Sequence, residues 1–422
     1  MENCLLVDTI KNATHNKYHQ KLESSPYANL LKNYKLPIES YVGHIRAMAI
    51  IHGVLEHEIR KTRNKTLLLV WTEEMQKYPL LEKDMIYFFP QWIKDIPESF
   101  ENAQSLAKNI RLRVESFPES LIGYLYVLEG SSIGAKVIKK DLIFQFPFLE
   151  NKGDHYLSSY GDDTLKKWEN FKQRVNSIQI EPSQKQMIIE AACEIYEGII
   201  DIFQSLYPLQ MEKMKYLSVS LNPEAGAHPI PQDVKEIQAS IQAGEKCMDK
   251  FPYQKIRFGE RGRKFAHSDS AWLATLVNLK KEEVIHQVKW LKRVLSNRGL
   301  PSYMLQVHLE ILHDELCKLV PEKQKEYEKL KIAAEEIYSF RQSYMNEHAF
   351  SSLSKHLTSD MDKECFLKTG LSASLLASAI IDEKAGIGNT VQNILKWVTD
   401  SQVHFVDAFQ SYIKRVSSLI TT

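Results

Sequence analysis

The sequence predicts an all-α protein made of two helical domains. Apolar residues recur at helical spacing over residues 39–61, 100–115 and 185–214, whereas the alternation typical of strands is scarce. A third observation separates two such regions: residues 221–233 contain three prolines and one glycine, which cannot continue a helix. At 422 residues, the chain is long enough for two domains that each bury a core.

These breaks set the expected boundaries. We expect a first helical domain over residues 1–218, a linker over 219–233 and a helical accessory domain over 234–422. Within the first domain, Pro37, Pro90, Pro97 and Pro118 fall between helices or at their starts.

The second domain is predicted to contain helices at 281–297, 302–319, 321–346 and 388–418. Gly299 should end the first of them and Pro301 should open the next. Before them, residues 257–264 read as a basic, glycine-bearing loop, followed by a helix start at 268–272. Such a loop either binds an anion or is solvated surface.

Composition excludes several classes of protein. A net charge of +1 with 25% charged residues argues against a general nucleic-acid binder, which needs a concentrated basic surface. The five cysteines form no Cys-x-x-Cys pair, as is typical of a reducing compartment. We see no leader at the N-terminus and no uninterrupted apolar run near the ~20 residues that cross a bilayer, so we expect a cytoplasmic protein without a membrane span. Homo-oligomerisation stays open.

The most informative segment is the apolar helical stretch 121–141. Its centre carries Gly130, Ser131, Ser132, Gly134 and Ala135, although a glycine inside a helix costs roughly 0.5–1 kcal/mol relative to alanine. Either another helix packs closely on these small residues, or a flat ligand lies against the backbone.

Three colinear motifs favour the ligand. The sequence Tyr-Val-Leu-Glu-Gly-Ser-Ser-Ile-Gly at 126–134 resembles the distal-helix motif of bacterial, biliverdin-producing heme oxygenases. Residues 10–14 and 19–23 resemble the first helix of that family, and residues 156–161 and 168–175 resemble the segments that close its heme pocket. The resemblance covers about residues 8–207 and implies a heme-oxygenase-like helical domain.

The resemblance implies that His19 is the axial iron ligand. A neutral imidazole is a good ligand, and Glu23, one helical turn later, could orient the ring. The interval from the Ala-Thr pair at 13–14 to His19 is one residue longer than in the family. His15, one turn before His19, therefore stays open as the alternative ligand.

On the opposite face, the resemblance assigns the catalytic surface to Gly130, Ser131 and Gly134. The small residues would let the helix bend over the heme and direct oxygen at a meso carbon. Ser131 stands where animal members carry a carboxylate that organises water, so a hydroxyl would hold the water chain here. Glu129 is the nearest acid in sequence but lies roughly 100° further round the helix.

The two heme propionates require cations at the mouth of the pocket. Lys172 and Arg174 fall near the positions that bind propionate in the family, and Lys11 or Lys17 could help from the first helix. Tyr196 and Phe203 would line the pocket. Each of these residues also has an ordinary interpretation, as solvated charge or as plain core.

On this resemblance, heme is both cofactor and substrate, and is cleaved to biliverdin, carbon monoxide and ferrous iron. The sequence has no Rossmann glycine fingerprint, so electrons should come from an external ferredoxin, flavoprotein reductase or small reductant. Two other functions stay open: a non-catalytic heme-binding or sensing protein, and a heme-oxygenase-like di-iron oxidase.

A second metal site is conceivable in the C-terminal half. Two Glu-x-x-His pairs occur there, Glu283 with His286 and Glu310 with His313. Four-helix di-iron proteins use two such pairs, although on alternate rather than successive helices. In a chain with 14 histidines and 53 acidic residues, coincidence is the competing explanation.

Overall fold

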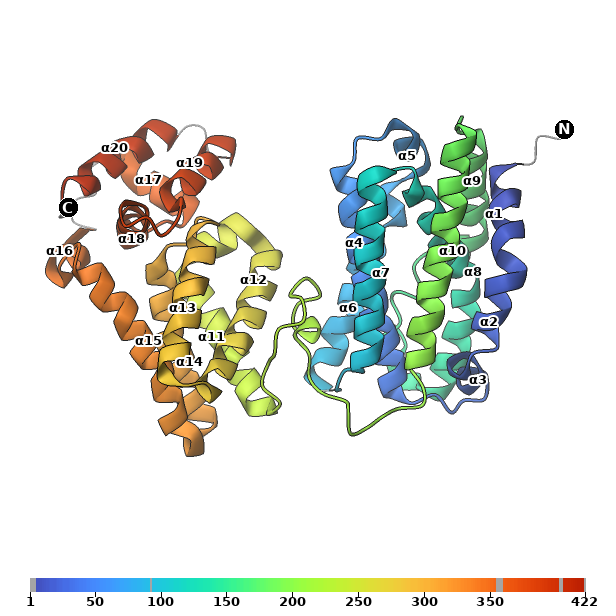
Figure 1. The fold of residues 1–422 in the computed structure, drawn as a ribbon, viewed down its shortest axis with the longest axis horizontal. Coiled ribbons are helices and arrows are strands. Elements are labelled where there is room, and N and C mark those ends of the chain that lie inside the picture. The colour runs from blue at the N-terminus through green and yellow to red at the C-terminus, as the bar shows by residue number, and fades with distance from the viewer. Residues whose placement is uncertain (1–4, 92, 354–359, 402–404, 421–422) are drawn as a thin grey trace. The chain divides into compact units, whose positions relative to one another are not determined.

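The computed structural model describes residues 5–91, 93–353, 360–401 and 405–420. They form two compact units, Met1–Glu224 and Ala225–Thr422, and the division falls inside the segment expected to be a linker. Both units are helical, as the sequence predicted (Figure 1). Among the described residues the only extended pairing is an isolated bridge between Asp95 and Lys215.

The first unit is a bundle of long helices with short ones at its ends. Its α-helices are α1 (Leu6–Thr14), α2 (Gln20–Glu23), α3 (Pro26–Lys32), α4 (Ile38–Lys61), α5 (Lys65–Val70), α6 (Tyr78–Phe88), α7 (Pro97–Ser116), α8 (Ser120–Gln145), α9 (Thr164–Ser177) and α10 (Pro182–Ser205).

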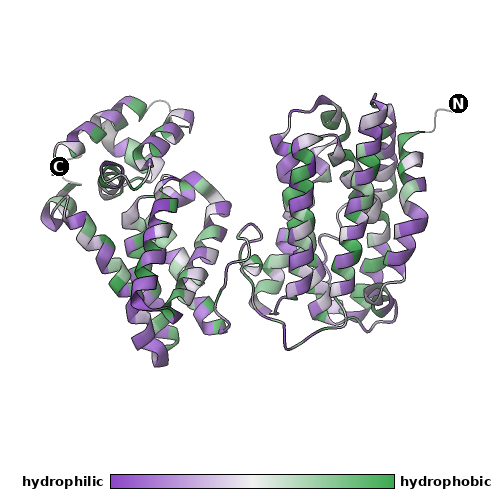
Figure 2. Ribbon diagram, viewed as in Figure 1, coloured by the Kyte–Doolittle hydropathy of each residue, from purple (hydrophilic) through white to green (hydrophobic). Residues whose placement is uncertain are grey.

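Helix α10 organises this bundle, because α8, α7 and α1 all pack against it (Figure 1). The contact with α8 is close at Gly123, where a Cβ would lie 2.1 Å from the carbonyl oxygen of Ile188. Most helices carry an apolar side and a polar side, as the hydropathy colouring shows (Figure 2). One apolar core results, running from Ile10 of α1 to Ile202 of α10.

The periodic segments of the first domain appear as α4, α7 and α10. One end differs from the prediction, because α10 stops at Ser205 rather than continuing to residue 214. Pro208 explains the earlier end: proline lacks the backbone N–H that a continuing helix needs, and it restricts the residue before it.

The second unit is also helical and contains two apolar clusters. Its α-helices are α11 (Val234–Lys250), α12 (Pro252–Thr275), α13 (Lys281–Ser296), α14 (Ser302–Leu319), α15 (Gln324–Gln342), α16 (Glu347–Ser352), α17 (Asp360–Thr369), α18 (Ala373–Lys384), α19 (Thr390–Ser401) and α20 (Val406–Ser417). Gly299, with a φ of 77°, ends α13, and Pro301 precedes the first residue of α14, as expected.

Two predictions for this unit are wrong. Residues 257–264 form no loop: they lie within α12, whose helical dihedrals are interrupted only at Gly259 (φ 54°, ψ −146°). Ser268 is consequently a mid-helix residue and not a cap. The single helix expected over 388–418 is recorded as α19 and α20, and residues 402–404 between them lie outside the described part.

One described helix, α8, is long and apolar enough to cross a membrane by length and composition alone. In this bundle, 61% of its most apolar window is buried against other helices. Helices 17 and 18 would pass the same test only if they were taken together across their 80° bend.

Candidate functional site

The segment that carries His19 is interrupted by a π-turn. Helix α1 ends at Thr14, residues His15–His19 form one π-helical turn, and α2 begins at Gln20. A π-turn accommodates one residue more than an α-turn, and such turns are frequent at functional sites. It therefore absorbs the extra residue between the Ala-Thr pair and His19, while Thr14 stays buried with its hydroxyl donating to the carbonyl oxygen of Ile10 at 2.8 Å.

His19 is the less exposed of the two candidate ligands. Its side chain is 44% exposed, and its Nδ1 lies 3.7 Å from Oε2 of Glu23, so the carboxylate lies near the ring, beyond hydrogen-bond distance. His15 is exposed, and the two ring centroids are 5.0 Å apart. The orienting role of Glu23 and the choice of ligand both stay predictions.

Tyr18 anchors the π-turn to α10. Its buried ring stacks on Tyr196 with centroids 5.8 Å apart, and its hydroxyl donates to Oε1 of Glu197 at 2.7 Å. Lys17 donates to the same hydroxyl at 2.6 Å. Lys17 and Tyr196, expected at a heme pocket, are therefore engaged in holding the turn in place.

The other predicted pocket residues have contacts of their own. Phe203 packs on the rings of Tyr27 and His44, with centroid distances of 4.8 and 5.0 Å, in the core of the bundle. Lys172 pairs with Glu169 on its own helix at 2.7 Å.

Arg174 connects α9 to the end of α5. Its Nε donates to the carbonyl oxygen of Val70 at 2.9 Å, and an Nη hydrogen points to the sulfur of Met75. Lys11 is exposed at the end of α1. The propionate contacts expected of Arg174, Lys172 and Lys11 stay predictions.

Helix α8 changes character at Gly130. Residues 120–129 are all buried, whereas Ser131, Ile133, Gly134 and Val137 are exposed, and the helix runs through both glycines without interruption. A Cβ on Gly130 would lie 3.3 Å from the ring of Trp168, but one on Gly134 would meet no described atom within 4 Å. Helix packing therefore explains Gly130, and leaves Gly134 on an uncovered apolar surface.

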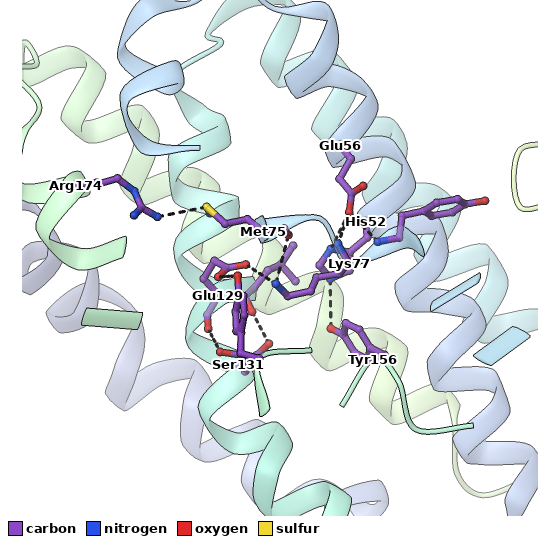
Figure 3. A network of polar contacts seen from close by, with 12 residues as sticks. His52, Glu56, Met75, Lys77, Glu129, Ser131, Tyr156 and Arg174 are labelled. Carbon is purple, nitrogen blue, oxygen red and sulfur yellow. Dashed lines mark hydrogen bonds and ion pairs between the residues drawn. The ribbon is translucent and has the colours of Figure 1, made fainter. Parts of the chain in front are cut away.

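Beneath this surface lies a buried polar network (Figure 3). The ammonium of Lys77 lies 3.4 Å from Oε1 of Glu129, and each side chain is only 3% exposed. Tyr160 donates to the other oxygen of Glu129 at 2.6 Å, and the Lys77 ammonium lies 3.6 Å from the centre of its ring. Burial raises the pKa of Glu129 and lowers that of Lys77, and the attraction between their charges opposes both shifts.

A second branch of the network leads from the α8 surface inward. The Tyr156 hydroxyl lies 3.3 Å from Nε2 of His52, and the hydroxyl of Ser131 on α8 lowers the pKa of Tyr156 against the larger, opposite effect of burial. Nδ1 of His52 lies 3.9 Å from Oε1 of Glu56, which also accepts the backbone N–H groups of Lys77 and Tyr78 at 2.8 Å. Oε2 of Glu56 is buried and bonds to no described residue.

Burial shifts the pKa values of the groups in this branch. Burial, with a smaller contribution from Lys77, lowers the pKa of His52 to about 3, so its imidazole is neutral near pH 7. Burial raises the pKa of Glu56 and that of Tyr156. A neutral imidazole between a phenol and a carboxyl group can accept a proton on one nitrogen and release one from the other.

The sequence did not single out His52, Glu56 or Lys77. A signal was present for the first two, because they lie one turn apart in the mostly apolar stretch 47–56, where buried polar groups are costly unless they are paired. Lys77 is polar and lies beside a short connection, so nothing marked it as buried. Glu129, which lies further round the helix than Ser131, points into the network, where it contacts Lys77 and Tyr160.

The second metal site is not supported. Across the described residues no group of three or more His, Cys, Asp and Glu side chains could hold a metal. Glu283 instead accepts the backbone N–H of Lys280 at the start of α13, and His313 lies 3.5 Å from Glu328 of α15. His286 and Glu310 therefore have no shared metal site with these two residues.

The chain is similar to several known heme oxygenases. The chain is 22% identical to heme oxygenase 1 of Gallus gallus over 48% of this chain and 70% of that protein, and 25% identical to heme oxygenase 1 of Rattus norvegicus over 51% and 76%. Among solved structures, it is similar to a heme oxygenase from Leptospira interrogans, at 22% identity, a TM-score of 0.43, and coverage of 48% of this chain and 99% of that one.

A profile of the heme oxygenase family matches residues 5–205. That range contains the π-turn, the exposed half of α8 and the buried polar network. The N-terminal segment of the chain, residues 5–205, is therefore recognised as a heme oxygenase family segment, and the assignment extends to no other part of the chain.

Proposed function

We propose that the first unit binds heme and cleaves it, with oxygen and an external electron donor, to biliverdin, carbon monoxide and ferrous iron. The observation that carries this proposal is the family match over residues 5–205, which includes every motif that the reaction would use. Electrons would come from a ferredoxin, a flavoprotein reductase or a small reductant.

The residues present fit a heme. His19 is partly exposed and has a carboxylate near its Nδ1, which leaves Nε2 for the iron. Gly134 has open space where a side chain would stand, and the neighbouring Ile133 and Val137 are 38% and 63% exposed. An apolar, uncovered surface of this kind suits the face of a porphyrin. When bound, heme supplies the iron that activates oxygen; the protein supplies position and protons.

The proton supply would run through the second branch of the network. Ser131 offers an exposed hydroxyl on α8, and the Tyr156 hydroxyl lies 3.3 Å from Nε2 of His52. A proton given up by Tyr156 to the oxygen site would be replaced from His52, and His52 would be reprotonated at Nδ1 from Glu56. The raised pKa of Glu56 favours the protonated carboxyl that this step needs.

Hemin titration of the full chain tests the proposal. We expect one hemin to bind per chain with a Soret band, and biliverdin to appear when ascorbate or reduced ferredoxin is added in air. A ferric complex that persists under these conditions would instead identify a heme-binding or sensing protein. Absence of a Soret band would reject both.

A further inference from the structure

The second unit contains a cavity of about 440 Å³ between α12, α13 and α14. Its volume lies in the range of small-molecule sites. The break of α12 at Gly259, in a backbone conformation that other residues rarely adopt, lies beside Phe258, which lines the cavity.

The walls of this cavity are mostly apolar. Phe258 and Phe265 of α12 line it, together with Leu295 of α13 and Leu300 of the following turn. All four side chains are only half-buried. Their uncovered area would be removed from water by a ligand with an apolar body.

Among the polar side chains of the lining, His308 and Asp269 differ in how well their hydrogen-bonding groups are satisfied. His308 has its Nε2 at 2.6 Å from the hydroxyl of Ser270, and burial lowers its pKa to about 4, so it is neutral. Asp269 accepts no hydrogen bond from any described residue, and burial raises its pKa to about 6 against an opposing effect of Arg298. An enclosed carboxylate without a donor is costly, and a ligand donor would remove that cost.

The rim of the cavity is basic. Arg261 and Arg298 are exposed and line it. Arg257 lines it too, but it is used structurally: it donates to the Tyr253 hydroxyl, and its Nη2 donates to the carbonyl oxygen of Asn393 at 3.2 Å. Exposed guanidinium groups beside an apolar cavity favour an anionic ligand.

We infer that this cavity is a second ligand site, which takes an organic anion with an apolar body and one hydrogen-bond donor. The body would contact Phe258, Phe265 and Leu295. The donor would bond to Asp269, and the anionic group would lie at Arg298. The inference is independent of heme chemistry in the first unit.

The probe 8-anilinonaphthalene-1-sulfonate carries all three features, namely an aromatic body, an anilino N–H and a sulfonate, and it fluoresces in apolar sites. Titrated into the full chain, it should bind one site that is lost in Leu295→Trp, because the indole fills the cavity. Ile256→Trp, at an exposed position of the same unit outside the cavity, should leave that site unchanged.

Two further variants keep the test independent of packing. Arg298→Gln should weaken the probe about tenfold, as expected for loss of one charge-assisted contact. Asp269→Leu should weaken it by a similar factor and also raise the melting temperature, because it removes a carboxylate that lacks a donor. Circular dichroism should show that both variants are folded. Equal probe affinities in the wild type, Asp269→Leu and Arg298→Gln would then overturn the inference. Probe that binds to the first unit contributes equally to all three titrations and does not affect the comparison.

Displacement of the probe then identifies the source of the ligand. Biliverdin carries carboxylates and pyrrole N–H donors, whereas 12-hydroxydodecanoate carries one carboxylate and one hydroxyl. Displacement by biliverdin assigns the site to tetrapyrroles, and displacement by the hydroxy acid alone assigns it to aliphatic acids.

Discussion

At the scale of single residues, the N-terminal unit contains two kinds of titratable group. The side chains of His19 and Glu23 are partly exposed to solvent, whereas those of His52, Glu56, Lys77 and Glu129 are buried. Exposed groups can bind a ligand, and buried ones can hold protons at shifted pKa values.

His19→Ala tests the ligand assignment. We expect the variant to lose the axial ligand, so that the heme spectrum changes and turnover stops, and added imidazole should restore both in part. His15→Ala is the matched control and should leave the spectrum nearly unchanged. If His15→Ala lost the axial ligand and His19→Ala kept it, His15 would be the ligand. Absorption spectra of the hemin complexes and biliverdin yield are the measurements.

Gly134→Leu tests the surface of α8. No described atom lies within 4 Å of the new Cβ, and leucine favours a helix over glycine by up to about 1 kcal/mol, so the free energy of unfolding should not fall. Biliverdin yield should fall strongly, because the side chain occupies the space of the porphyrin. Lys108→Leu, on the exposed side of α7, should change neither quantity. A normal biliverdin yield from Gly134→Leu would show that heme does not bind against this surface of α8.

His52 should make the unit sensitive to acid. Its pKa in the folded chain is about 3, below the ordinary 6.5. Between these two pH values, His52 is protonated in the unfolded chain and neutral in the folded chain. The contribution of neutral His52 to the free energy of unfolding is therefore complete above pH 6.5. It is lost as the pH falls from 6.5 toward 3, by at most about 1.4 kcal/mol per pH unit. His52→Gln should lose less stability over this window in urea titrations. Parallel curves for the two proteins would contradict the assigned protonation state.

The Lys77–Glu129 pair should be costly to break on one side. Lys77→Met leaves the buried carboxylate of Glu129 without its cation, which typically costs about 3–5 kcal/mol. The double variant Lys77→Met/Glu129→Leu removes both charges and should recover most of this loss. Urea unfolding at pH 7 measures both. A loss below 1 kcal/mol in the single variant would show that the pair is not buried as described.

At the scale of elements, the π-turn at His15–His19 is the feature that sets the register of the first helix. It lets Thr14 stay in the core and Tyr18 reach Glu197 while His19 remains accessible. A plain α-turn with the same number of residues would rotate one of these side chains away from its place.

Deletion of Asn16 tests this role. Asn16 is exposed within the π-turn, so its removal should convert the turn to an α-turn without loss of a packed side chain. We expect helical content to stay close to that of the wild type and the hemin spectrum to change. Asn16→Ala keeps the residue count and should bind hemin as the wild type does. An unchanged spectrum in the deletion variant would show that the turn does not position His19.

At the scale of the whole molecule, the two units have separate apolar cores. We therefore expect a fragment of residues 1–224 to fold and to bind one hemin. In calorimetry of the full chain, hemin should raise the temperature of one transition and leave the other in place. A folded fragment that binds no hemin would show that the site needs residues of the second unit.

The sequence predicted the helical class, most long helices and the colinear motifs, because these depend on local periodicity and on proline and glycine positions. It could not predict the partners of Arg174, the burial of Lys77 or the pairing of His313 with α15, because each depends on which helices become neighbours. Residues 257–264 were misassigned for a related reason: two glycines and five charged residues read as a loop, but packing keeps the segment helical on both sides of Gly259.

The uncovered side of α8 has a practical consequence for the production of the protein. Val137 and Phe144 are 63% and 70% exposed on the described helix that is most apolar overall. Water-facing apolar area on such a helix promotes self-association and adsorption to lipid. Cells that synthesise the chain without enough heme should therefore accumulate aggregates, and supplementing the growth medium with a heme precursor should increase the yield of soluble protein.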